Sequence, residues 1–171
     1  NQTEFCTAQE CGEELLTLAQ RLHDPARVME AYRLLGTIVF RRAELVMARA
    51  HLEEGLALYH AHQSRVHAML SVRDPGVEVQ GFVALTLWFL GYPDQAFTSF
   101  QQALHLAQAL AHPYSLAVAL NMMAWLHQCR RESLLTQDRA EAVIALATEH
   151  GFAQRQAAST MLRGWVLADQ G

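Results

Sequence analysis

The stretch VALTLWFLGYPDQAFTSFQQALHLAQAL, residues 83–110, contains two apolar helical runs separated by a sharp stop at GYPDQA. Gly91 tolerates the left-handed backbone conformation that commonly ends a helix. Pro93 suits the first turn of the next helix, where its missing N–H would have had no partner in any case. Asp94 places a negative charge against the positive end of that helix. The stretch therefore predicts two helices joined by a tight turn.

Small residues recur at regular distances around this turn. Ala96 and Ala103 flank Phe100 on one apolar face of the second helix, and Ala84 lies twelve residues before Ala96 in the first. Spacings of three, four and seven residues place side chains on one side of a helix. We therefore expect two antiparallel helices that approach closely where these alanines meet.

The same pattern occurs elsewhere in the chain. Gly36, Ala48 and Gly55 repeat it in the N-terminal half, and the joints TLAQRLHDP (17–25), HLAQALAHP (105–113) and IALATEHGF (144–152) resemble one another. In the third unit Met123 and Leu135 occupy the positions where small residues are expected, which predicts a wider helix crossing there. Repetition at this scale is the signature of a helical repeat array.

Turn signals and apolar periodicity together predict the elements of the array. The fold class is all-α, with antiparallel helix pairs stacked as a right-handed α-α superhelix. Residues 1–171 form one repeat domain, which we expect to be a fragment of a longer array. The predicted helices cover 4–22, 26–41 with 43–60, 77–90 with 93–111, 114–129 with 132–149, and 153–169, with a short helix or loop at 62–73. Residues 4–22 and 153–169 are half repeats, and 26–60, 77–111 and 114–149 are full repeats.

Composition and charge exclude several classes of function. Hydrophobic residues make up 51% and charged residues 18% of the chain, a balance typical of a globular protein. The net charge of −4 argues against a nucleic-acid or anionic-membrane surface. All 13 basic residues are arginine, which excludes chemistry that depends on lysine. No apolar run approaches the roughly 18 residues of a membrane span, and a cytoplasmic protein is expected.

Longer strings point to a family. The spacing of Leu35-Gly36, Ala48 and Gly55 resembles the tetratricopeptide repeat. The strings LGYPDQA (90–96), HPYSLAVAL (112–120), WLHQCRRE (125–132) and IALATEHGF (144–152) resemble the C-terminal helical repeat region of bacterial multidomain proteins. Those proteins combine a class III adenylate/guanylate cyclase domain with a STAND-type AAA ATPase. The resemblance implies a regulatory or sensing arm of a larger signalling ATPase or cyclase.

No cluster of side chains indicates catalysis, a metal or a cofactor, and we predict none of these. His60, His62 and His67 form the densest histidine cluster, but no cysteine or acidic residue completes a metal site nearby. Cys129 precedes Arg130 in the sequence, and a neighbouring positive charge would lower the pKa of its thiol. A nucleophile would still need a base and an oxyanion site.

The leading hypothesis is a non-catalytic module that binds a protein or peptide, or a neighbouring domain of its own protein, along its concave face. In tetratricopeptide arrays the first helix of each pair lines that face. Transferring the inward positions to this chain predicts twelve binding residues: Glu30, Arg33, Thr37, Arg41, Glu78, Trp88, Asn121, Trp125, His127, Gln128, Trp165 and Asp169. The alternatives are a small-molecule sensor and a module that self-associates through its terminal helices.

Overall fold

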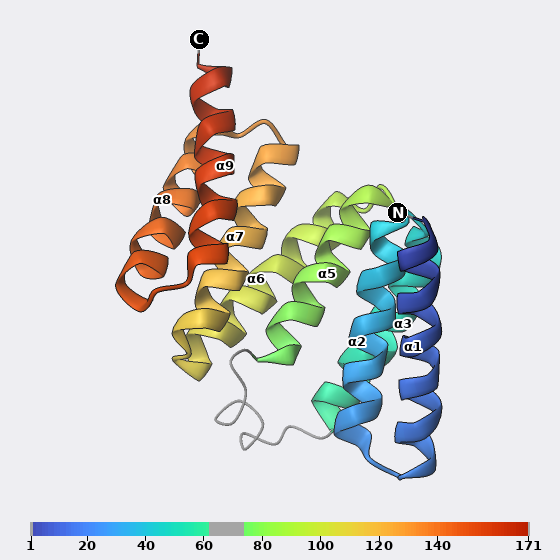
Figure 1. Cartoon of the computed structure of the whole chain (residues 1–171). Coiled ribbons are helices and arrows are strands. Elements are labelled where there is room, and N and C mark those ends of the chain that lie inside the picture. The colour runs from blue at the N-terminus through green and yellow to red at the C-terminus, as the bar shows by residue number, and fades with distance from the viewer. Residues whose placement is uncertain (1, 62–73, 171) are drawn as a thin grey trace.

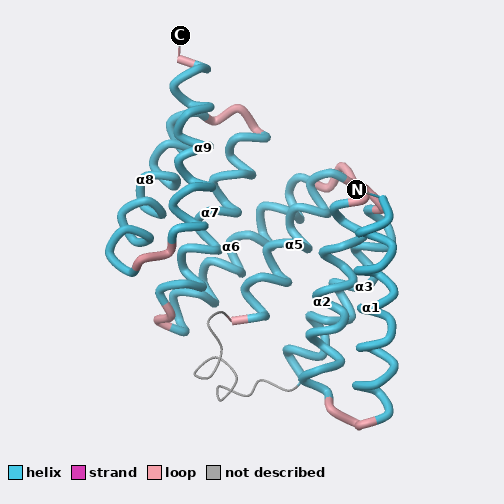
Figure 2. The backbone as a smooth tube through the Cα atoms, in the orientation of Figure 1, coloured by secondary structure: helices cyan, strands magenta, loops and turns pink. Residues whose placement is uncertain are grey.

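The computed structural model describes residues 2–61 and 74–170, with side chains from residue 7 onward. Within these ranges the chain consists of helices and contains no strand (Figures 1 and 2). The helices are α1 (Gln2–Arg21), α2 (Pro25–Arg41), α3 (Leu45–Ala61), α5 (Pro75–Phe89), α6 (Pro93–Leu110), α7 (Pro113–Cys129), α8 (Ser133–His150) and α9 (Ala153–Asp169). The predicted bounds agree with these to within two residues. The element predicted at 62–73 lies outside the described residues.

The helices form an array of antiparallel pairs, which confirms the predicted fold class. The complete pairs are α2 with α3, α5 with α6, and α7 with α8, while α1 and α9 lie at opposite ends of the array (Figure 1). We call α2, α5, α7 and α9 first helices, and α1, α3, α6 and α8 second helices. Each second helix packs against the first helix that follows it as well as against its own pair partner, where it has one.

The turns inside the three complete pairs have the same length and the same backbone conformation. Each contains three residues, and the middle one has a positive φ: 62° at Ala43, 87° at Gly91 and 59° at Arg131. We call this middle residue the turn centre. Glycine adopts such a conformation without steric cost, but only the second pair has a glycine at the turn centre. Because the turn geometry is the same, equivalent positions in the three pairs can be found by counting residues from the turn centre.

Counting from the turn centre places small residues at the helix crossings of all three pairs. Seven residues before it lie Gly36, Ala84 and Ala124, and five residues after it lie Ala48, Ala96 and Thr136. All are buried. The sequence prediction for the third pair was therefore wrong by one residue. Leu135 is 44% exposed, and the crossing that Met123 and Leu135 were expected to widen is made by Ala124 and Thr136.

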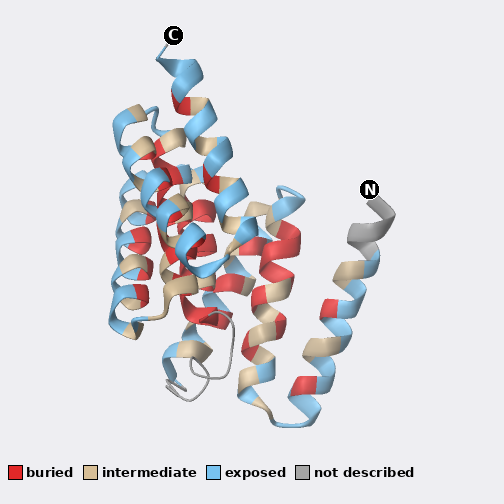
Figure 3. Ribbon diagram, turned by 60° about the vertical axis from the view of Figure 1, so that its left-hand side comes forward, coloured by how far each residue is buried: buried red, intermediate tan, exposed pale blue. Residues whose placement is uncertain are grey.

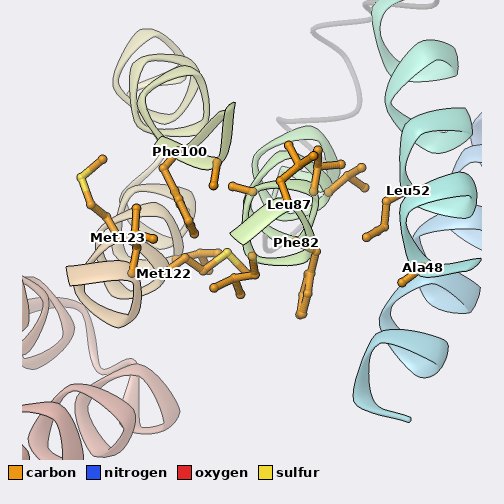
Figure 4. Close-up of a cluster of buried hydrophobic side chains, with 14 of the residues drawn as sticks. Ala48, Leu52, Phe82, Leu87, Phe100, Met122 and Met123 are labelled. Carbon is orange, nitrogen blue, oxygen red and sulfur yellow. The ribbon is translucent and has the colours of Figure 1, made fainter. Parts of the chain in front are cut away.

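Helix α5 is the centre of the molecule. It is apolar on almost every side, and it contacts α2, α3, α6 and α7, as expected for a helix with no solvent face. Its residues Phe82 and Leu87 join Leu52 of α3, Phe100 of α6 and Met122 of α7 in one hydrophobic cluster (Figure 4). Buried residues concentrate in these central helices, whereas the outer sides of the terminal helices are exposed (Figure 3).

A short polar network also ties successive pairs together. The Tyr59 hydroxyl of α3 donates to Asp74 Oδ2 at 3.2 Å, and the Asp74 backbone N–H donates to Ser115 Oγ of α7 at 2.8 Å. Asp74 Oδ1 caps α5 by accepting from the Val77 N–H at 2.9 Å. Burial raises the pKa of the Asp74 carboxyl, although these hydrogen bonds oppose the shift. Side chains or backbone groups from three pairs therefore meet at one buried residue, Asp74.

Candidate binding groove between α7 and α9

The first helices form a continuous layer, in which α2 packs on α5, α5 on α7 and α7 on α9. The second helices pack mainly on first helices and not on one another. The layer of first helices is therefore the more closely spaced one, as on the inner side of a curved array. Three junctions between first helices lie along this inner layer, and they differ in what fills them.

The junction between α2 and α5 is filled by an ion cluster around one buried arginine. Arg33 is 6% exposed. Its Nη2 donates to Glu30 Oε1 at 2.6 Å, and its Nη1 lies 3.3 Å from Glu78 Oε2 of α5. Burial by itself would lower the pKa of the guanidinium, but its hydrogen bond to Glu30 and the charge of Glu78 raise that pKa above its ordinary value. Thr37 is also buried, and its hydroxyl donates to the Arg33 carbonyl at 2.8 Å.

These four residues were predicted to bind a partner, and the structure does bring them together. Arg33 and Thr37 are inaccessible, however. The Arg33 guanidinium contacts one carboxylate of its own helix and one of α5, and the Thr37 hydroxyl donates to a backbone carbonyl. Their role in this structure is to join α2 to α5. The prediction of an open polar surface at this junction was wrong for Arg33 and Thr37.

The junction between α5 and α7 is filled by an apolar contact. A Cβ atom added to Gly81 of α5 would lie only 2.1 Å from Met122 Sδ of α7, so the thioether lies directly on the glycine backbone. Met122 is buried. The close approach needs a residue without a side chain on α5 and leaves no groove at this position.

The junction between α7 and α9 is open. A groove of about 410 Å³ runs between the two helices and is lined by Asn121, Trp125 and Gln128 of α7 and by Ala158, Met161 and Leu162 of α9. The three α7 residues were all predicted as binding residues. They are three and four residues apart, so they follow one face of the helix over two turns.

The walls of the groove combine exposed apolar surface with neutral amides. Trp125 is 38% exposed and Met161 is 77% exposed. Asn121 Nδ2 donates to Ser159 Oγ of α9 at 2.9 Å, which fixes the orientation of the amide and joins the two walls. None of the lining residues carries a charge. The groove therefore offers an aromatic ring and a thioether for apolar contact, with carboxamides for hydrogen bonds.

The remaining predicted binding residues lie elsewhere. Trp88 is half-buried and packs against the main hydrophobic cluster. Arg41 is exposed in the last turn of α2, where a positive charge complements the helix dipole. Trp165 is half-buried on α9, one turn beyond Met161. Asp169 is exposed at the end of α9, and its Oδ2 accepts a hydrogen bond from Ser133 of α8.

His127 was predicted on the inner face, but its side chain is 6% exposed and points into the turn between α7 and α8. Its Nδ1 lies 2.6 Å from Glu132 Oε2. Burial alone would raise the pKa of the Glu132 carboxyl, but the hydrogen bonds from His127 and Arg130 lower it below its ordinary value. The prediction for His127 was wrong, because position 127 faces the second helix and not the groove.

The environment of Cys129 does not activate it. Burial raises the pKa of its thiol above the ordinary value, whereas the sequence had suggested that Arg130 would lower it. The guanidinium of Arg130 instead forms a salt bridge with Glu132 at 2.8 Å and lies 5.5 Å from the Phe97 ring centroid. In the described part of the chain, no three His, Cys, Asp or Glu residues are grouped so that they could hold a metal ion. His62 and His67 lie outside it.

The α9 wall of the groove was missed at the sequence level. Met161 and Ala158 precede Trp165 by four and seven residues, on the same helical face. Trp165 and Asp169, which were predicted as binding residues, lie on the same face of α9 as Met161 and Ala158. Alanine, leucine and methionine by themselves give little indication of a binding site, because such residues are more often found in a core.

No family model and no curated protein matches the sequence. Among solved structures, the crystal structure of BtubC (BKLC) from P. vanneervenii is similar, with a TM-score of 0.66 and 17% sequence identity. The similarity covers 98% of this chain and 74% of that chain. At this level of identity it shows a shared helical fold. No helix in residues 2–61 or 74–170 combines the length and the apolar composition needed to cross a membrane.

Proposed function

We propose that the chain is a binding module that holds an extended, uncharged segment of a partner protein in the groove between α7 and α9. The observation that supports this is the pair of exposed apolar side chains, Trp125 and Met161, between two walls that also carry amides. Exposed aromatic residues in a concave surface are frequent anchors of protein interfaces. We also infer a binding role and not a catalytic one, because no lining residue is a general acid or base at neutral pH.

The spacing of the amides suits an extended peptide. Asn121 and Gln128 are seven residues apart on α7, a distance of about 10.5 Å along a helix axis. Three residues of an extended chain span about 10 Å. Each carboxamide offers both a donor and an acceptor, so the two can pair with peptide groups on either side of one apolar side chain. That side chain would lie against Trp125, which is between the amides on the same face.

The absence of charge in the groove indicates which kind of peptide segment can bind there. Its walls are neutral and the chain as a whole carries a net charge of −4. A charged side chain buried here would lose its hydration without gaining an opposite charge. We therefore expect the segment to present apolar and neutral polar residues where it enters the groove.

The wider context of this binding follows only from the sequence resemblance described above. On that basis we propose that the module is a tetratricopeptide-like regulatory arm of a cytoplasmic signalling protein with an ATPase or cyclase domain. A segment of a neighbouring domain in the same protein is then one source of the ligand. A separate partner protein is the other source.

A selection from a random peptide library displayed on phage tests the proposal. Selected peptides should share an apolar residue flanked by neutral residues, and a labelled copy should bind in solution. Trp125→Ala should weaken binding by about 30-fold, the effect of losing about 2 kcal/mol at an aromatic anchor. Phe89→Ala is the matched control, because Phe89 is also an exposed aromatic residue, 48% exposed, but lies on α5 outside the groove. Equal affinities of the Trp125→Ala variant and the parent would refute the site.

A small organic ligand is the second candidate, because the volume of about 410 Å³ falls in the range of ligand pockets. A thermal-shift screen with a metabolite library distinguishes the two. The small ligand would be favoured if a compound raised the melting temperature of the parent but not that of Trp125→Ala, and if the phage selection yielded no binding peptide.

A further inference from the structure

Every complete pair covers the same four positions of its first helix with its second helix. These positions lie 14, 11, 7 and 4 residues before the turn centre. They are Met29, Tyr32, Gly36 and Val39 in α2, Val77, Gln80, Ala84 and Leu87 in α5, and Ala117, Leu120, Ala124 and His127 in α7. All are buried apart from Tyr32, which is half-buried. We call them the pairing face.

Contacts across the pairs show that the second helix provides this cover. At the position 7 before the turn centre, a Cβ atom on Gly36 would lie 2.6 Å from Leu52 Cγ of α3. At the position 11 before it, the Gln80 side chain donates to Ser99 Oγ of α6 at 2.6 Å. The equivalent residues of the first pair, Tyr32 and His51, have ring centroids 6.0 Å apart. The register of the two helices is therefore the same in both pairs.

Helix α9 carries a pairing face that nothing in the described structure covers. It has the same length as α2, 17 residues, so the positions correspond one to one. The equivalents are Ala157, Thr160, Gly164 and Leu167, and all four are exposed. Leu167 is 63% exposed, and a Cβ atom on Gly164 would meet nothing within 4 Å. The face is small, uncharged and shaped like three faces that each receive a helix.

Helix α1 shows the reverse situation. It packs on α2 as α6 packs on α7, so it is a second helix, yet no first helix of its own lies beside it in the described residues. The turn after α1 contains His23, which has a positive φ of 51°, as the turn after α6 contains Ala111 and the turn after α8 contains Gly151. Counting back from these residues makes Leu18 equivalent to Leu106 of α6 and Leu146 of α8.

The exposure of Leu18 identifies the uncovered side of α1. Leu106 is half-buried and packs against a cluster that contains Val77 of its pair partner α5. Leu146 is half-buried in a cluster with Ala117 and Leu120 of its pair partner α7. Leu18, in contrast, is 53% exposed. The side of α1 that carries Leu18 is the side on which a first helix lies in the other pairs.

We propose that α1 of a second copy of this chain covers the pairing face of α9, so that the two half pairs complete one helix pair between molecules. By the register of the complete pairs, Gly164 of one copy lies opposite Gly12 of the next, and Thr160 lies opposite Cys11. In the α5–α6 pair the Gln80 side chain also donates to Gln102 Oε1 at 2.9 Å, and the α1 equivalent of Gln102 is Glu14. The Thr160 hydroxyl can therefore donate to the Glu14 carboxylate, while Gly164, Gly12 and Cys11 are uncharged. The contact joins different surfaces of the two copies, and such a head-to-tail arrangement continues into open chains unless the rotation closes a ring.

Sedimentation velocity of the complete chain over a range of concentrations tests the association. The weight-average mass should rise past that of a dimer, because each copy retains a free α1 or α9. Gly164→Gln should hold the chain as a monomer, since the long side chain stands at the crossing. Its helical circular dichroism should equal that of the parent, because position 164 faces open space within one copy. Gly164→Ala is the matched control and should still associate, because Ala84 and Ala124 occupy the same crossing in complete pairs.

A cross-link tests the register independently. Thr160→Cys treated with a short bis-maleimide should yield covalent dimers through Cys11 of another copy, and adding Cys11→Ser should remove them. A link within one molecule is impossible, because α1 and α9 lie at opposite ends of the array (Figure 1). A chain that stays monomeric at every concentration, or an association that Gly164→Gln leaves unchanged, would overturn the proposal. Dimers that persist after Cys11→Ser would overturn the register.

Discussion

The same substitution, glycine to alanine, should have opposite effects at two equivalent positions of the array. Gly36 of α2 and Gly164 of α9 are each the twelfth residue of their helix. Replacing a helical glycine with alanine stabilises a helix by about 1 kcal/mol when nothing else changes. Position 164 is open, so Gly164→Ala should show this gain in full.

At position 36 a packing cost opposes the gain. The new Cβ atom would lie 2.6 Å from Leu52 Cγ, 2.8 Å from Leu52 Cδ2 and 3.3 Å from the Leu52 backbone nitrogen. Because the backbone of α3 is among these contacts, a change of the leucine rotamer cannot relieve them all. Overpacking of this kind costs about 1–3 kcal/mol. Gly36→Ala should therefore be less stable than Gly164→Ala by about 1–3 kcal/mol.

Thermal unfolding followed by far-ultraviolet circular dichroism measures the difference. In a domain of this size each kcal/mol moves the melting temperature by about 2–4 °C, and dilute protein keeps association at α9 out of the comparison. In a double-mutant cycle with Leu52→Ala, the penalty of Gly36→Ala should largely disappear. If Gly36→Ala melted at or above the melting temperature of Gly164→Ala, the inference that α2 and α3 pack too closely at position 36 to accept a Cβ atom would be wrong.

Three further predictions concern charged side chains. Arg33→Met should destabilise the chain by about 3 kcal/mol, because it leaves Glu78 buried opposite an apolar side chain, and adding Glu78→Gln should restore part of the loss in urea denaturation. Glu132→Gln should be less stable than the parent at neutral pH but equal to it in acid. The pKa of Glu132 is depressed in the folded chain, so its contribution is present above the ordinary carboxyl pKa and is lost as the pH falls through the folded value. Asp74→Asn should show the opposite trend, because the pKa of Asp74 is raised: the parent loses stability relative to the variant as the pH rises through the folded value. A parallel pH dependence of parent and variant would contradict either assignment.

The sequence alone determined the helices, their order and their pairing. Pro25, Pro93 and Pro113 begin helices and Gly91 turns the chain between two of them. These effects are local, since they depend on the backbone of one residue and its neighbours. Three groove residues of α7, Asn121, Trp125 and Gln128, were also among the positions transferred from the inward face of the tetratricopeptide repeat.

Tertiary structure decided which junctions between first helices are filled and which is open. Arg33 and Asn121 both lie ten residues before their turn centres, yet Arg33 is buried between Glu30 and Glu78 while Asn121 lines a groove. Helical periodicity gives the direction of a side chain but not the identity of the residue that it meets on the next helix. That depends on the length and charge of both partners and on the spacing of the helices, which is a property of the packed array. For the same reason the crossing at Ala124 and Thr136 became clear only from the turn centre at Arg131, because a one-residue error in register rotates a helical position by about 100°.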